Sequence, residues 1–127
     1  MKYLVLLALF STNAHSHGMN KPGPHNGHIR MIGTIHTEMV LEKNDIKVYL
    51  LDINFKNATV KNSSVEALYF GKNQPNTQVK CRISGDHFSC DLPKNFSKIQ
   101  QINLRVSREN YVPKDLAEYK LPLLFVN

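Results

Sequence analysis

The sequence predicts an all-β protein, an antiparallel, immunoglobulin-like β-sandwich of about seven strands with an extended N-terminal arm. Short segments in which apolar and polar residues alternate recur along the 127 residues, and polar loops rich in Asn, Lys and Ser separate them. No stretch has a convincing helical period. The two cysteines flank a short loop, at positions where paired strands would bring them together. These three observations favour a sandwich of short strands over any helical fold.

The expected strands are residues 28–42, 47–54, 64–70, 78–83, 88–92, 101–108 and 118–126. In the first strand Ile35 and Met39 point to one face, while His36 and Glu38 point to the other. Gly33 interrupts the early part of this strand, and we expect a bulge or a bend there, because glycine has no side chain to pack. One two-faced strand is therefore predicted over residues 28–42.

The turn that follows sets which residues face each other. If Asn44 and Asp45 form a two-residue loop, Glu38 faces Leu51 on the returning strand. Pro122 lies in the last expected strand, and proline has no N–H to donate to a ladder. We therefore expect an edge strand or a bulge there.

The cysteine pair fits a hairpin. Cys81 and Cys90 lie on either side of the four-residue loop 84–87, on the inward parity of their strands. We expect a cross-strand disulfide between them, since such bonds persist in exported proteins. The rival interpretation is a thiol pair that ligates Cu(I) or exchanges electrons, but the spacing lacks the short CxxC pattern.

The first sixteen residues have the pattern of a secretory signal peptide. Lys2 supplies the basic start, residues 3–10 are an unbroken apolar run too short to cross a bilayer, and small residues follow. Cleavage after Ser16 or after Ala14 fits the pattern, and both place a histidine at the new amino terminus. We expect a periplasmic or secreted protein with no transmembrane span after cleavage. The expected parts are a signal peptide (1–16), a flexible arm rich in His, Gly and Pro (17–27) and the β-sandwich domain (28–127).

Histidines are concentrated near this terminus, where five of the six fall within residues 15–36. Imidazole is a common ligand of copper and zinc, and a Gly/Pro arm can bring several to one ion. If His17 is the first residue, its amine and ring can chelate one metal ion together. If His15 is first, an imidazole at the third position allows the square-planar nitrogen set that Cu(II) prefers. Copper is the expected cofactor and zinc the second choice, with candidate ligands His17, His25, His28 and His36.

Two carboxylates are candidates for the same site. Glu38 shares its strand face with His36, so it could ligate a metal or orient a ligating imidazole; it could equally be a solvated charge. Asp52 stands within an apolar strand, where it is either a partnered structural acid or part of the site. His87, alone in its hairpin loop, is given no role.

The run KPGPHNGHIRMIGTIHTEMV, followed by KVYLLDINFKN, resembles small exported bacterial proteins and N-terminal modules of heavy-metal efflux adaptors. Those proteins carry a Gly-Pro-His-Gly-Gly segment, a Glu about a dozen residues on and a Tyr-Leu-x-Asp strand. The resemblance covers residues 21–57 and implies roles for His25, Glu38 and Asp52, with Asn26 replacing the first glycine after the histidine. The chain is also similar, more weakly, to CopC-type copper-resistance proteins, which are periplasmic β-sandwiches with a mature N-terminal histidine.

Other chemistries lack their signatures. The sequence has no GxSxG, HExxH, P-loop or Rossmann pattern, so an enzyme is not expected. The net charge of +6, which becomes +5 when Lys2 leaves with the signal peptide, is spread over scattered residues without interleaved aromatics. Nucleic acid is therefore not an expected partner.

Three functional hypotheses follow. The leading one is an exported metal-binding protein, a Cu(II) carrier or buffer that uses N-terminal histidines. The alternative is a metal-free β-sandwich module that docks on an efflux or envelope protein through its exposed edges. The third, a thiol redox protein, requires Cys81 and Cys90 to be reactive.

Overall fold

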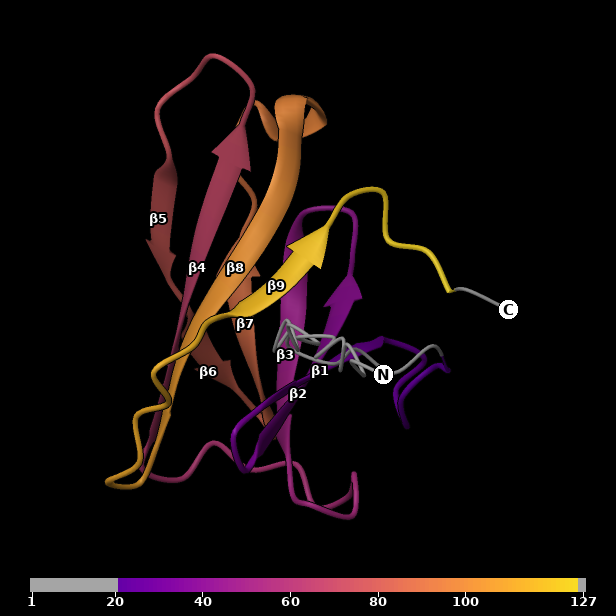
Figure 1. Cartoon of the computed structure of the whole chain (residues 1–127), viewed down its shortest axis with the longest axis vertical. Coiled ribbons are helices and arrows are strands. Elements are labelled where there is room, and N and C mark those ends of the chain that lie inside the picture. The colour runs from indigo at the N-terminus through magenta and orange to yellow at the C-terminus, as the bar shows by residue number, and fades with distance from the viewer. Residues whose placement is uncertain (1–20, 126–127) are drawn as a thin grey trace, which may run out of the picture.

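A computed structural model of the chain describes residues 21–125, which form two antiparallel β-sheets (Figure 1). One sheet has the strand order β1-β2-β3-β7-β6 and the other β5-β4-β8-β9. The strands are β1 (His28–Ile32), β2 (Ile35–Leu41), β3 (Asp45–Leu51), β4 (Ser63–Gly71), β5 (Thr77–Lys80), β6 (Arg82–Ser84), β7 (His87–Asp91), β8 (Ile99–Arg108) and β9 (Ala117–Lys120), with one short 3-10 helix, η1 (Phe96–Lys98). The predicted all-β sandwich is confirmed, with nine strands rather than about seven; the immunoglobulin-like topology stays a prediction.

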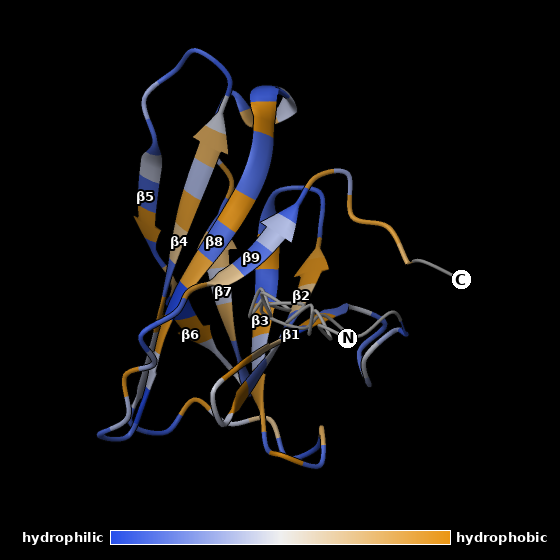
Figure 2. Ribbon diagram, viewed as in Figure 1, coloured by the Kyte–Doolittle hydropathy of each residue, from blue (hydrophilic) through white to orange (hydrophobic). Residues whose placement is uncertain are grey.

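The main core lies between the two sheets. Alternation along β4 buries Val65, Ala67 and Tyr69 on one side, and the same alternation is visible along β4 and β8 in Figure 2. Met39 and Phe88 pack into this core from the other sheet. Burial of this apolar surface supplies most of the stability of a domain of this size.

The first expected strand is a β-hairpin. β1 and β2 pair antiparallel, with Ile32 opposite Ile35, so only Gly33 and Thr34 lie in the turn. Gly33 has φ +57°, a conformation that glycine adopts without steric cost and that suits a two-residue hairpin turn. The expectation of one strand over residues 28–42 with a bulge at Gly33 is corrected accordingly.

The next turn is shifted by one residue from its expected position. Lys43 and Asn44 form the loop, and Glu38 lies opposite Tyr49 instead of Leu51. The Glu42 N–H donates to the Asp45 carbonyl, 2.9 Å away, and closes the loop. Both registers put the same residues on each face, so alternation alone could not choose between them.

The expected strand over residues 78–83 divides between the two sheets at Cys81. β5 pairs with β4, and β6 pairs with β7. At the crossing, the Cys81 N–H donates to the Val65 carbonyl at 3.0 Å. The hairpin loop is also tighter than expected, because Ser84 pairs with His87 and leaves only Gly85 (φ +64°) and Asp86 in the turn.

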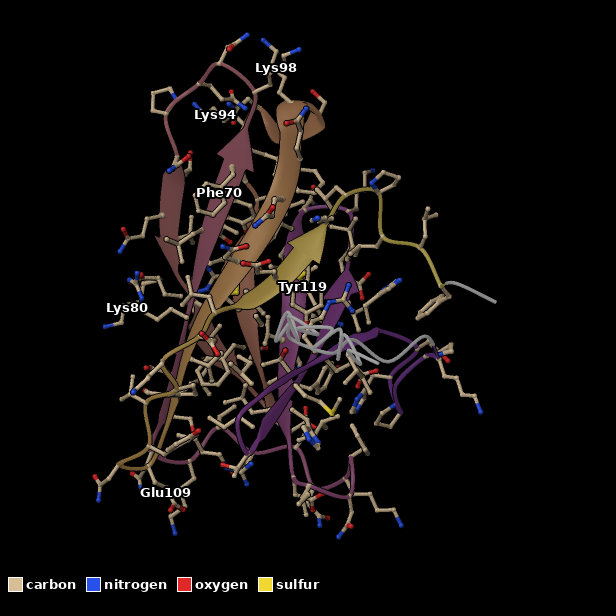
Figure 3. The ribbon with its side chains drawn as sticks, in the orientation of Figure 1. Phe70, Lys80, Lys94, Lys98, Glu109 and Tyr119 are labelled. Atoms are coloured by element: carbon tan, nitrogen blue, oxygen red, sulfur yellow. A yellow bond between two sulfur atoms is a disulfide. The ribbon has the colours of Figure 1, made fainter. Side chains whose placement is uncertain are left out.

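Tyr119 of β9 ties the two sheets together near their open edges. Its hydroxyl lies 2.7 Å from the Thr37 hydroxyl and donates toward the Thr37 carbonyl, and both residues are fully buried. The Arg30 guanidinium lies 4.8 Å from the centre of the Tyr119 ring and donates to the Glu118 carbonyl. β9 is an edge strand, as expected, but it ends at Lys120, so the strand expected over residues 118–126 is corrected and Pro122 lies outside it. Figure 3 labels Tyr119 at this position.

Basic side chains are spread over the surface. Lys80, Lys94 and Lys98 are exposed, and Figure 3 shows them at the margin of the sandwich, distributed over different elements. No helix among residues 21–125 is long and apolar enough to cross a membrane.

The disulfide between Cys81 and Cys90 is present as expected, with the two Cα atoms 4.4 Å apart. Replacing both cysteines by alanine should lower the free energy of unfolding by about 2–3 kcal/mol, the loop-closure entropy of a ring of this length. Urea unfolding of the oxidised protein and of the double variant measures the difference. A change below about 0.5 kcal/mol would contradict the expected cross-link contribution.

Candidate functional site

A row of three side chains crosses the outer face of the five-stranded sheet. Ile29, Glu38 and Tyr49 lie in register on β1, β2 and β3. Ile29, Tyr49 and Leu51 form a small apolar cluster there, separate from the main core. The residues that precede β1 fold back over this row, so a face that would otherwise meet water is covered.

The covering segment is a tight turn over residues 23–27. The Gly23 N–H donates to the Gly27 carbonyl, and the Asn26 N–H donates to the Gly23 carbonyl. Asn26 has φ +61°, which asparagine tolerates better than most residues. A Cβ on Gly23 would collide with the Glu38 carboxylate, and one on Gly27 would lie 2.7 Å from the Met39 carbonyl oxygen. The glycines thus allow the backbone to lie directly on β2.

The Glu38 side chain is fully buried and holds this turn in place. Its Oε1 accepts from His25 Nδ1 at 2.6 Å, and its Oε2 accepts from the His25 N–H at 2.8 Å and the Gly27 N–H at 2.9 Å. A buried carboxylate requires such partners, because burial removes the water that would otherwise solvate it. Glu38 is therefore a structural anchor and not a solvated charge.

The His25 ring lies flat against Tyr49. The ring centroids are 3.6 Å apart, with 6° between the planes. Burial raises the pKa of Tyr49 above its ordinary value of 10.0, and the phenol is protonated at neutral pH with or without this shift. The His25 side chain keeps 32% of its surface exposed, and its Nε2 has no hydrogen-bond partner among the described residues. One fixed imidazole thus presents a ring nitrogen at the surface.

His87 also lies next to Tyr49, with 5.0 Å between the ring centroids. Its Nδ1 donates to Asp86 Oδ1 at 3.0 Å, and this hydrogen bond is the main cause that lowers the pKa of Asp86. Sequence reasoning gave His87 no role. Its position follows from the pairing of β3 with β7, and no local sequence signal announces that pairing.

His28 lies on the opposite face of the sheet from His25. It pairs with Met39, a core residue, while its neighbour Ile29 belongs to the outer face. Its ring stacks on Phe125 with the centroids 3.9 Å apart. Burial, aided by the nearby Arg30 charge, lowers the pKa of His28, which favours the neutral ring.

His36 is buried on the outer face of β2, two residues before Glu38. Its Nδ1 donates to the Asp52 carbonyl at 3.0 Å, and its ring stacks on Phe55. Asp52 follows β3 instead of standing within the strand, and its carboxylate accepts from the N–H groups of Asn54 and Lys56 and from the Asn57 side chain. Here Asp52 acts as a partnered structural acid that organises the loop after β3.

The structure therefore brings two of the expected site residues, His25 and Glu38, into direct contact. His28 lies on the opposite face of the sheet, while His36 binds the Asp52 backbone and is not hydrogen-bonded to His25 or Glu38. His17 lies outside the described residues. Within residues 21–125, no group of three or more His, Cys, Asp or Glu side chains is arranged to hold a metal ion. The pair formed by His25 and Glu38 therefore offers one oriented imidazole, that of His25, and not a complete coordination site.

Comparison with protein-family models, with curated proteins and with solved structures finds no match to this chain.

Replacing Glu38 by leucine should release the turn over residues 23–27. The substitution leaves the N–H groups of His25 and Gly27 without their acceptor, so we expect a loss of about 2–3 kcal/mol of stability. Urea unfolding measures that loss, and amide hydrogen exchange at Gly27 should accelerate by at least tenfold. Glu42→Leu, at an exposed position, is the control. Unchanged exchange at Gly27 in Glu38→Leu would contradict the anchoring role.

Asp52 gives the loop after β3 a pH dependence. Hydrogen bonds, with the Lys56 N–H first among them, lower the pKa of Asp52 below its ordinary value of 3.8. A lowered pKa in the folded state means that the stabilisation is complete above that value and is lost as the pH falls through the lower folded pKa. In an NMR titration, the Asn54 and Lys56 amides should report a midpoint below 3.8, absent in Asp52→Asn. A midpoint above 3.8 would show that these bonds do not favour the ionised form.

Proposed function

We propose that the protein is an exported metal-binding protein that carries or buffers Cu(II), with His25 as its positioned ligand. The observation that carries the proposal is the pair formed by His25 and Glu38. In metal sites, a ligating imidazole commonly donates its second ring N–H to a carboxylate, which fixes the tautomer and raises the basicity of the ligating nitrogen. Glu38 accepts from Nδ1 of His25, so Nε2 remains to bind the ion.

The remaining ligands would come from the chain before Lys21. His17 is eight residues before His25, a separation that an extended chain spans with up to roughly 26 Å of reach. After cleavage behind Ser16, His17 would supply an amine and an imidazole to the same ion. After cleavage behind Ala14, His15 and His17 would supply an amine, deprotonated amides and an imidazole. Nitrogen sets of this kind favour Cu(II), with zinc the second choice.

The disulfide supports export. Disulfides are rare in reducing compartments and persist in the periplasm and outside the cell. Cys81 and Cys90, which form the disulfide, are both buried, and the described residues contain no free cysteine. A bond in this environment favours a structural role over thiol redox chemistry, and it fits a periplasmic or secreted location.

The alternative function is a metal-free module that docks on an efflux or envelope protein. It is favoured by apolar side chains exposed at one end of the sandwich, where Ile53 and Val112 are 71% and 65% exposed. Ile53 and Tyr111 line a common shallow pocket between the loops after β3 and β8. An exposed apolar patch rimmed by polar residues marks an interaction site, and these side chains would form part of one under this hypothesis. Under this hypothesis, the pair formed by His25 and Glu38 has only its structural role.

Metal titration of the exported protein tests the leading proposal. Mass spectrometry first fixes its amino-terminal residue. Calorimetry should then give a dissociation constant for Cu(II) of about a micromolar or tighter, with weaker binding of Zn(II). Affinity should fall at least tenfold in His25→Asn, and by about 10–100-fold in Glu38→Gln, which alters the orienting carboxylate.

His28→Asn is the matched substitution on the opposite face of the sheet, and it should leave Cu(II) affinity unchanged. A version with one extra residue before the mature terminus should bind more weakly if the terminal amine is a ligand. Absence of binding tighter than about a micromolar would refute the metal-binding proposal and favour the docking module. Equal affinity in His25→Asn and the wild type would remove His25 from the ligand set.

A further inference from the structure

A groove with a volume of about 670 Å³ opens between the two sheets at the end of the sandwich where β2 finishes and β8 begins. The residue His28, at the start of β1, forms part of its wall. The apolar part of the wall comes from Met39, Leu41, Phe96, Leu121 and Leu123. A volume of this size falls within the range of small-molecule sites, which are concave, mostly apolar and supplied with a few polar groups.

The groove is also lined by the polar residues Asn26, Ser97 and Gln100, but one polar atom in its wall, in His28, is unusual. Nε2 of His28 is buried and has no hydrogen-bond partner in the described part of the chain. Buried polar atoms in folded proteins are nearly always paired, because an unpaired one has lost its bonds to water without replacement. The unpaired Nε2 of His28 beside a groove of this size therefore indicates a ligand-binding site in which the ligand supplies the missing hydrogen-bond partner.

The chemistry of the missing partner follows from the ring. His28 is favoured in its neutral form. We assign its proton to Nδ1, because Nε2 is the nitrogen that is buried without a partner, and an orphaned buried N–H is rarer in folded proteins than an unpaired acceptor. Nε2 is then an acceptor. The partner must therefore donate a hydrogen bond, and the remainder of the molecule must suit apolar walls. No lysine or arginine lines the groove, so nothing there selects for a carboxylate or a phosphate.

The C-terminal segment covers this end of the groove. Leu121 and Leu123 line it, and Phe125 lies flat on the His28 ring. Phe125 is itself 37% exposed and Leu124 is 71% exposed, so this cover is anchored by few buried contacts of its own. Phe125 covers one face of the imidazole, whereas a hydrogen bond to Nε2 lies in the plane of the ring.

We propose that this groove binds a small single-chain amphiphile through a terminal hydroxyl, which donates to Nε2 of His28 while the chain lies against Leu41, Phe96 and the 121–123 segment. The proposal does not rest on metal binding, although Asn26 and Gly27, which belong to the turn that carries His25, also line the groove. The groove would thus bind fatty alcohols or similar hydroxylated chains, a ligand class distinct from the metal ion proposed for the N-terminal histidines.

Two probes of equal size test the hydroxyl. 1-Decanol and 1-methoxynonane have the same number of heavy atoms, but the ether cannot donate a hydrogen bond. The wild-type protein should bind 1-decanol about tenfold more tightly, measured by calorimetry below the solubility limit of each probe. In ¹⁵N NMR spectra, the Nε2 resonance of His28 should shift on addition of 1-decanol and stay nearly unchanged with the ether.

Variants separate the hydrogen bond from the groove. His28→Phe keeps an aromatic ring at this position, and it should remove the preference for 1-decanol. Ser97→Trp, at an exposed groove position, should weaken both probes at least tenfold by filling the space. His87→Phe is the matched control on the other face and should change neither affinity.

Equal affinity of the wild type for the two probes, or an unchanged preference in His28→Phe, would overturn the assignment of the hydroxyl to His28. Failure of both probes to bind, or equal binding by Ser97→Trp and the wild type, would overturn the groove as a site. If a variant fails to fold, the Nε2 resonance of the wild-type protein decides alone: a shift with 1-decanol only supports the proposal, and any other pattern refutes it.

Discussion

The buried carboxylate of Glu38 is the constraint around which the outer layer of this protein is arranged. An acid in the middle of a central strand, on the face that would meet solvent, would normally be hydrated. Here it is removed from water, and the resulting need for donors is met by two backbone N–H groups and one imidazole from a single turn. Because Gly23 and Gly27 allow close approach, the sheet gains a second, smaller core beneath that turn.

Much of the fold was predictable from alternation, which is a local signal. The positions of β4, β7 and β8 agree with the expected strands to within two residues, and the disulfide follows from the parity of Cys81 and Cys90. The register of the β2–β3 hairpin was not predictable. Moving the pairing by two residues, from Leu51 to Tyr49 opposite Glu38, leaves the same side chains on each face of the sheet. The change of sheet at Cys81 was not predictable either. It depends on β5 pairing with β4 and β6 pairing with β7, and local alternation does not identify these partners.

The candidate site was predictable only in part, for the same reason. The resemblance pointed to His25, Glu38 and Asp52; the first two lie together, whereas Asp52 organises the loop after β3. The clustered histidines that the structure describes, His25, His28 and His36, do not converge on one point. Alternation along β1 and the tight turn at Gly33 distribute His28 and His36 to opposite faces of the sheet. His87 lies next to Tyr49 because β3 pairs with β7, and no short sequence motif predicts this long-range pairing.

The passage of the chain from one sheet to the other at Cys81 affects how the domain folds. Residues of one sheet come from 28–51 and 82–91, and residues of the other from 63–80 and 99–120, so the two are interleaved along the chain. No single break in the polypeptide yields one complete sheet and its complement. Completing either sheet requires pairing between strands that are distant along the chain, a topology associated with slow folding.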